Sequence, residues 1–260
     1  MDLGLTGKNA LITGGSHGIG LAIAKNLAEE GCNVAICARN KERLANAVEE
    51  LKAMKVQALG VMADVLKSGD IETVVQQIIQ SWHTVHVLVN NVGGGGSWGS
   101  NSIEETKEDV WIDVYNKNAM AAVRFTRLIL PYMRKQKWGR VITISSIHGR
   151  EGGGRPWYNM AKSAEISFMK SLALNHDLVR DGITFNSVAP GSIMIPDTYL
   201  AKEYNKDPKS FQKMVEAQYP LGRLGTTEEV ASLVAFLCSQ KASLINGASI
   251  TVDGSESRSF

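Results

Sequence analysis

Apolar and polar residues follow two alternating patterns along most of this chain. Seven short apolar runs read as strands, and they fall at residues 8–13, 33–37, 56–63, 86–89, 141–145, 183–188 and 248–252. The stretches between them place apolar residues at helical spacing, most clearly over residues 41–54, 69–82 and 221–238. This alternation predicts an α/β fold, in which a doubly wound parallel sheet of about seven strands carries helices on both faces.

The length and composition fit a single domain that binds small molecules. Residues 1–260 contain no internal repeat or low-complexity linker, so we expect one domain. The net charge of +2 gives no reason to expect a nucleic acid or an anionic membrane as partner. Cys32, Cys37 and Cys238 lack metal-ligand spacing, so no metal site is expected. The first residues do not resemble a signal peptide and no apolar run is long enough to span a membrane, which favours a cytoplasmic protein.

A glycine-rich turn joins the first strand to a helical pattern. Gly14, Gly18 and Gly20 lie in the sequence TGGSHGIG at residues 13–20. Gly14 and Gly18 allow a pyrophosphate to approach the backbone N–H groups, and Gly20 allows the helix to pack tightly on the sheet. The spacing Gly-x3-Gly-x-Gly differs from the commoner Gly-x-Gly-x-x-Gly, so the general motif is matched in part. The turn predicts a Rossmann-type dinucleotide-binding fold, although a glycine-rich turn with no ligand is the alternative at this point.

The end of the second strand indicates which dinucleotide is bound. A fold that prefers NAD usually carries an acid there for the ribose 2′-hydroxyl, whereas an arginine suits the 2′-phosphate of NADP. This chain has Ala38 and then Arg39, and His17 in the glycine turn adds a second donor. We therefore expect NADP(H) to be preferred, with NAD(H) possible. After the third strand, Asp64 offers a carboxylate to an adenine amino group or caps a turn.

A tyrosine and a lysine four residues apart offer proton-transfer chemistry. Tyr158 and Lys162 share one helix face, because positions i and i+4 are neighbours. A phenol titrates near pH ~10 unless a nearby cation favours the phenolate, and Lys162 supplies that cation. Ser146 follows a buried strand, where it can hydrogen-bond a carbonyl or alcohol oxygen. These residues predict an acid–base site for a C=O/CH–OH pair, although a Tyr–Lys pair alone also occurs on ordinary amphipathic helices.

Three further features border the predicted ligand edge of the sheet. The fourth strand runs into a glycine-rich loop at residues 90–96, at the strand end where open α/β sheets bind ligands. Asn118 lies near the start of a helical pattern, where it indicates a bound water, a bent helix or a tolerated buried polar residue. Residues 192–220 leave the sixth strand without strand character, and we expect them to form a substrate lid.

These motifs together resemble the short-chain dehydrogenase/reductase family over the whole chain. They stand in the family's order as Thr13-Gly14-x3-Gly18-x-Gly20, Asn90-Asn91-Val92-Gly93, Ser146, Tyr158-x3-Lys162 and Pro190-Gly191. The resemblance implies a seven-stranded Rossmann-type sheet, usually assembled as a homotetramer, with a homodimer as the alternative. It also implies a catalytic set of Asn118, Ser146, Tyr158 and Lys162.

Each member of this set has a role in the family scheme. Tyr158 would be the general acid–base, and Ser146 would position the reacting oxygen. Lys162 would hold the nicotinamide ribose and lower the pKa of the phenol, while Asn118 would hold a water in the proton relay. The residues that the resemblance assigns to the cofactor are Gly14, Ser16, Gly18, Ile19, Arg39, Asp64, Val65, Asn91 and the backbone at Ile193.

Two positions depart from the family pattern. Val92 replaces the usual small Ala, which is a minor change. Ile195 stands where many members carry a Thr that contacts the nicotinamide carboxamide. That contact would be weaker or made by Thr198, and neither residue is assigned to the site.

The leading functional interpretation is an NADPH-dependent oxidoreductase that reduces a ketone to a secondary alcohol. Within the family the general likeness is to 3-oxoacyl carrier-protein reductases. The alternative is an NAD(P)-dependent dehydrogenase that oxidises a sugar or another secondary alcohol, because the same residues serve both directions. A non-catalytic dinucleotide-binding scaffold would be expected to lose Tyr158 or Lys162, and a methyl-donor-binding protein has no use for that pair, so both rank lower.

Overall fold

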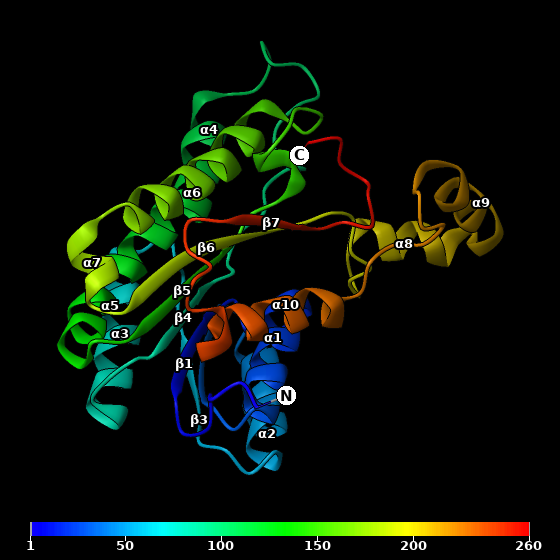
Figure 1. Ribbon diagram of the computed structural model, residues 1–260. Coiled ribbons are helices and arrows are strands. Elements are labelled where there is room, and N and C mark those ends of the chain that lie inside the picture. Colours follow the sequence, from blue (N-terminus) through cyan, green and yellow to red (C-terminus); the bar gives the residue numbers. More distant parts are fainter. Residues whose placement is uncertain (1, 260) are drawn as a thin grey trace.

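A seven-stranded parallel sheet forms the centre of the molecule in the computed structural model, which describes residues 2–259 (Figure 1). The strands are β1 (Asn9–Thr13), β2 (Asn33–Ala38), β3 (Ala58–Met62), β4 (Val87–Asn90), β5 (Gly139–Ile144), β6 (Ile183–Pro190) and β7 (Ser249–Val252). Their order is β3-β2-β1-β4-β5-β6-β7, and each neighbouring pair is parallel. The predicted α/β fold with a seven-stranded sheet is confirmed.

Helices cover both faces of this sheet, as Figure 1 shows. One face carries α1 (Gly18–Glu29), α2 (Lys41–Ala53) and α10 (Thr227–Cys238). The other carries α3 (Ser68–Trp82), α5 (Ala121–Gln136) and α6 (Pro156–Ala173), with α4 (Glu108–Tyr115) and α7 (His176–Arg180) against α6. Successive side chains of a strand point to opposite faces, so Ile12 of β1 joins the first core and Leu11 joins the second.

The chain reverses its direction of travel across the sheet between β1 and β4, which lie side by side. Ligands of doubly wound sheets bind outside the carboxyl ends of the strands at such a reversal. The two loops that start here are joined through Thr13, whose hydroxyl accepts the N–H groups of Asn91 and Val92 at 2.9 and 3.0 Å. The glycine turn after β1 and the glycine loop after β4 therefore form one rigid edge.

Local sequence signals explain several boundaries. Pro156 stands in the first turn of α6, where its missing N–H costs no hydrogen bond. Thr226 and Glu229 form a reciprocal capping box at the start of α10. Between α4 and α5 the chain makes one π-helical turn, η1 (Asn116–Met120), in which Asn118 is a buried polar residue. β3 begins at Ala58 and not at the predicted residue 56, because the N–H of Gln57 donates to the Asn33 side chain and not to a neighbouring strand.

Residues after β6 extend away from the sheet. They form α8 (Tyr199–Lys206) and α9 (Pro208–Gln218), which stand out from the body in Figure 1 and enclose a small apolar cluster around Phe211 and Val215. One residue of the segment, Ile193, makes an isolated parallel bridge with Gly225. Two single-turn 3-10 helices complete the fold, η2 (Ile147–Gly149) and η3 (Gln240–Ala242). Within residues 2–259, no helix is both long and apolar enough to cross a bilayer.

Candidate active site

A cavity of about 600 Å³ opens at the carboxyl ends of the central strands. A second, of about 360 Å³, lies beside it and shares His17, Asn91 and Gly93 with the first. The predicted site residues in the first wall are His17, Gly18, Ile19, Gly20, Asn91, Ser146, Tyr158, Lys162 and Ile193. Those in the second are Gly14, His17, Arg39, Asp64, Val65 and Asn91. Residues from seven separate parts of the sequence thus meet along one groove.

Two adjacent serines at the end of β5 have different surroundings. The Ser145 hydroxyl donates to the backbone oxygen of Lys162 at 2.9 Å, which ties the strand end to α6. The Ser146 oxygen accepts the N–H of His148 at 3.2 Å, and its hydroxyl hydrogen is not used by that contact. Ser146 therefore keeps a donor for a bound oxygen, whereas Ser145 has a structural bond.

Tyr158 is half-buried in the wall of the first cavity. The His148 ring packs edge-on against its ring, with the centroids 6.3 Å apart, and Lys162 Nζ lies 5.8 Å from the ring centroid. The Tyr158 ring therefore lies beside both an imidazole and an ammonium in the wall of the first cavity.

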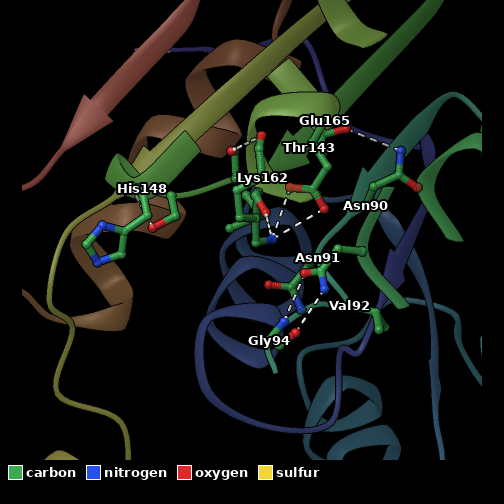
Figure 2. A network of polar contacts seen from close by, with 12 residues as sticks. Asn90, Asn91, Val92, Gly94, Thr143, His148, Lys162 and Glu165 are labelled. Carbon is green, nitrogen blue, oxygen red and sulfur yellow. Dashed lines mark hydrogen bonds and ion pairs between the residues drawn. The ribbon is translucent and has the colours of Figure 1, made fainter. Parts of the chain in front are cut away.

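Lys162 is almost completely buried, with 3% of its surface exposed. Its Nζ donates to the Ile144 backbone oxygen at 2.9 Å and to Glu165 Oε2 at 3.0 Å (Figure 2). Burial alone would lower the lysine pKa, but the attraction of Glu165 and Tyr158 outweighs it and the net direction is upward. Lys162 therefore stays charged at neutral pH.

Asn118 lies under the glycine loop and does not line either cavity. Its side chain accepts the N–H of Gly94 at 3.0 Å and donates to the Gly94 oxygen at 2.8 Å, and it also donates to the Val114 oxygen at 2.7 Å. A Cβ added at Gly93 would lie 2.6 Å from Asn118 Oδ1 and 2.8 Å from Lys162 Nζ. The loop and the two side chains are thus in direct contact.

The second cavity has a positive wall. No described residue accepts a hydrogen bond from the Arg39 guanidinium, and Lys117 of η1 lies in the same wall. Burial lowers the pKa of Lys117, and the nearby positive charges of Arg39 and Lys162 lower it further. Asp64 Oδ1 accepts the N–H of Leu66 at 3.1 Å, so the turn-capping alternative for this carboxylate holds, and Oδ2 stays available.

His17 and the segment after β6 meet across the groove. His17 Nε2 donates to the Pro196 oxygen at 2.9 Å, and Asp197 pairs with Arg43 of α2 at 2.9 Å. Ile195 packs on the glycine turn, because a Cβ at Gly18 would lie 3.0 Å from its Cγ2. The Thr198 hydroxyl donates to the Ile195 oxygen at 2.7 Å. The groove is therefore bridged from α1 and α2 to the start of α8.

The glycine turn fits a dinucleotide in shape. Gly14 and Gly18 have φ values of +67° and +55°, which side chains rarely adopt, and a Cβ at Gly20 would lie 2.4 Å from the Gly14 oxygen. Such a turn leaves no side chains between the backbone N–H groups of the α1 start and a bound anion. Ser16 is half-buried within this turn and lines neither cavity.

The structure adds residues that sequence reasoning missed. Glu256 lines the first cavity from the other end of the chain and accepts the N–H and hydroxyl of Ser192 at 2.6 and 2.8 Å. The Arg258 N–H donates to Glu151 at 2.7 Å, so residues 253–259, the carboxyl-terminal tail, lie against the loop after β5. Glu165 was also missed, although an acid one turn after Lys162 is visible in the sequence.

No described residues form a His, Cys, Asp or Glu cluster suited to a metal.

The sequence is similar to known reductases over nearly its whole length. A family model described as enoyl-(acyl carrier protein) reductase matches residues 14–255. A 3-oxoacyl-[acyl-carrier-protein] reductase FabG of Staphylococcus epidermidis is 37% identical over 95% of this chain and 98% of its own. The FabG of Pseudomonas aeruginosa is 36% identical over 97% of this chain and 98% of its own.

Solved structures of reductases are also similar to this chain. An L-sorbose reductase from Gluconobacter frateurii, complexed with NADPH and L-sorbose, superposes with a TM-score of 0.91 and 35% identity, covering 100% of both chains. An actinorhodin polyketide ketoreductase variant with NADPH gives a TM-score of 0.88 and 32% identity over 97% of this chain and 98% of its own. The chain therefore belongs to the short-chain dehydrogenase/reductase family of oxidoreductases that act on CH–OH/C=O groups.

Proposed function

We propose that this protein is an NADPH-dependent reductase that converts a ketone to a secondary alcohol, with Tyr158 as the general acid. The observation that carries the proposal is the single groove that runs from Arg39, at one end, to Ser146 and Tyr158 at the other. Reductases of 3-oxoacyl carriers, of L-sorbose and of a polyketide are similar over almost the full chain, which supports reduction as the direction.

The residues present fit NADP(H) in charge and shape. The glycine turn would hold the pyrophosphate, Arg39 and Lys117 would face the 2′-phosphate, and the free oxygen of Asp64 would meet the adenine. Gly14, Ser16, His17, Ile19, Val65, Asn91 and Ile193 complete the proposed cofactor set. When bound, the nicotinamide supplies the hydride. No acid follows β2 to repel a phosphate, so NADP(H) is preferred over NAD(H).

The catalytic groups would act on the substrate oxygen. Ser146 donates a hydrogen bond to the carbonyl oxygen and Tyr158 donates its proton as negative charge develops there. Lys162 stabilises the resulting phenolate and has one N–H left for a ribose hydroxyl. Asn118 fixes the loop that covers this lysine, and a water held beside it would continue the proton path to solvent.

The α8–α9 segment is proposed to act as a lid over the substrate. Thr198, Tyr199 and Leu200 already belong to the wall of the first cavity. The rest of α8 has no buried side chain, and the aromatic residues Tyr199 and Tyr204 are 73% and 43% exposed. A substrate bound against them would remove this apolar surface from water, which favours closure.

A second substrate class is supported by polar side chains in the wall of the first cavity. Ser192, Glu256 and His148 line the first cavity, and His148 Nδ1 is buried without a partner among the described residues. Hydroxyl groups of a keto sugar would satisfy such side chains, in keeping with the similarity to an L-sorbose reductase. The corresponding reaction in reverse is oxidation of a sugar or polyol.

A substrate screen tests the proposal. NADPH oxidation is followed with 3-oxoacyl thioesters, keto sugars, steroids and simple diketones, and each assay is repeated with NADH. We expect turnover of at least one ketone class, with NADPH preferred. Turnover with secondary alcohols and NAD alone would favour the dehydrogenase alternative. Nucleotide binding without turnover of any of these classes in either direction would favour the non-catalytic scaffold.

A further inference from the structure

Lys162 is paired with a second buried ionisable group, Glu165, which lies one turn further along α6. The carboxylate oxygens Oε2 and Oε1 lie 3.0 and 3.3 Å from Lys162 Nζ (Figure 2). Only 1% of Glu165 and 3% of Lys162 is exposed. Taking two charges out of water costs several kcal/mol for each, so a buried ion pair often stabilises a fold no better than apolar side chains of the same volume. Stability alone therefore does not account for this pair.

The hydrogen bonds of Lys162 show what Glu165 does to its geometry. An ammonium has three N–H donors. One donates to the Ile144 oxygen at the end of β5 and one to Glu165, which leaves a single donor for the cavity that Lys162 lines. The carboxylate thus fixes the direction in which the remaining donor points.

The charges around the pair are few. Among the described residues, those that act on Lys162 are Glu165 and Tyr158 of α6, and Lys117 of η1 faces it with like charge. Lys162 acts on Glu165, and His148 of η2 faces the Tyr158 ring. Burial raises the pKa of Glu165 to about 7, although Lys162 lowers it in part. Burial and the charge of Lys162 thus act in opposite directions on this carboxyl group, and burial prevails.

We propose that Glu165 is a positioning residue that fixes Lys162 and sets how much positive charge Tyr158 experiences. This inference rests on the acid–base role proposed above for Tyr158. An ionised Glu165 cancels much of the ammonium charge and leaves the phenol less acidic. A protonated Glu165 leaves the ammonium unopposed and favours the phenolate. Proton gain or loss at Glu165 is thus transmitted to Tyr158 through Lys162, without contact between Glu165 and the substrate.

The test is a pH titration of the Glu165→Gln variant, which keeps the shape of the side chain and removes its charge. Ultraviolet phenolate absorbance reports Tyr158 directly, after subtraction of the Tyr158→Phe curve for the other five of the six tyrosines. We expect Tyr158 in Glu165→Gln to ionise at a pH at least about one unit lower than in the wild type. The decline of kcat/KM for ketone reduction with rising pH should move down by the same amount.

A matched control removes a similar ion pair at a position far from the active site. Glu49 and Lys52 form an exposed ion pair three residues apart on α2, at 2.9 Å, and Glu49→Gln should leave both curves at the wild-type position. The Lys162→Met variant provides the second control. Because Glu165 acts through Lys162, adding Glu165→Gln to Lys162→Met should not move the Tyr158 titration further.

Wild-type and Glu165→Gln curves that coincide would overturn the proposal, as would a shift that persists in the Lys162→Met background. If Glu165→Gln does not fold, Glu165→Asp replaces it, since this variant keeps a carboxylate but withdraws it by one methylene. If Tyr158 in Glu165→Asp ionises at a lower pH than in the wild type, the proposal is supported. If it ionises at the same pH, the proposal is contradicted. The absorbance titration requires no turnover, so it separates this inference from the proposed reaction, which fails if Tyr158→Phe remains active.

Discussion

Asn118 and Gly94 exchange hydrogen bonds in both directions, with the asparagine amide accepting at 3.0 Å and donating at 2.8 Å. The pair joins the π-helical turn η1 to the loop after β4. A π-helical turn changes the direction of the following residues, and such turns are frequent at functional sites. The exchange holds the loop against Lys162, so the backbone at Gly93 becomes part of the site's floor.

Replacing Gly93 should disturb this floor without changing any charged group. In Gly93→Ala the new methyl would lie 2.6 Å from Asn118 Oδ1 and 2.8 Å from Lys162 Nζ, so one of these side chains must move. Displacement by about 1 Å in an active site costs about 100-fold, and we expect kcat to fall by about that factor. Steady-state kinetics with circular dichroism measure the effect. Gly69→Ala is the control, since no atom lies within 4 Å of its added methyl, and equal kcat values for both variants would refute the prediction.

Tyr158→Phe should abolish most turnover and leave nucleotide binding largely intact. The variant keeps the ring that packs on His148 and removes the proton donor. General acid catalysis contributes about 10²- to 10⁴-fold, so kcat should fall within this range. Fluorescence titration should give a dissociation constant for NADPH within about threefold of the wild type, because the ring still packs in place. Tyr132→Phe on α5 removes a hydroxyl outside both cavities and is the control; activity retained in Tyr158→Phe would contradict the catalytic assignment.

Arg39→Asp should weaken NADPH far more than NADH. A hydrogen bond to a charged group contributes about 1.5–3 kcal/mol, which corresponds to about 10- to 100-fold in the NADPH dissociation constant. NADH lacks the phosphate and should lose little. Lys41→Asp makes the same charge change two residues away at an exposed position, and it should leave the ratio of the two constants unchanged. Similar losses for NADPH and NADH in Arg39→Asp would remove the case for a 2′-phosphate site.

His86 should make the protein less stable in acid. Its Nδ1 accepts the N–H of Asn9 at 3.0 Å, and burial followed by the charge of Lys8 lowers its pKa from 6.5 to about 4. The unfolded chain therefore binds the proton more readily, so this contribution is present above pH 6.5 and is lost as the pH falls towards 4. The side chain is half-buried, so we expect a loss of about 1–2 kcal/mol.

Urea unfolding over this pH range measures that loss. Glu165 has a raised pKa, so its contribution is largest below its ordinary value and declines as the pH rises towards 7, opposite to that of His86. The His86→Asn variant isolates the contribution of His86 to the pH dependence of stability, because the amide oxygen can accept the Asn9 N–H without titrating. The variant should lose less stability in acid than the wild type, whereas His83→Asn, at an exposed position, should follow the wild-type curve.

Much of the fold followed from residue order because buried parallel strands are continuous apolar runs. β5 is buried at each of its residues, but it begins at Gly139, two residues before the predicted run of 141–145, because Gly139 and Arg140 do not continue the apolar pattern. The positions of Gly14, Ser146 and Tyr158 in the groove could also be predicted from the sequence, because strand ends and helix faces determine where such residues point. The predicted 56–63 strand began too early, because the Asn33 side chain accepts the Gln57 N–H that a strand would use.

Other parts of the site depend on packing that a linear pattern does not contain. Glu165 and Lys162 have the same three-residue spacing as the exposed pair Glu49 and Lys52, and only the enclosing elements distinguish the two pairs. The contact between Glu256 and Ser192 joins residues 64 apart along the chain, with no periodic signal to announce it. The oligomeric state and the cytoplasmic location remain predictions.

Glu256 of the carboxyl-terminal tail belongs to the wall of the first cavity, although the tail lies outside the sheet and its covering helices. A substitution at Glu256 would therefore change the cavity wall without removing a core residue, while Ser146 and Tyr158 stay in place. Enzymes with the same Ser and Tyr pair can in this way differ in substrate through substitutions in a segment that the core does not depend on.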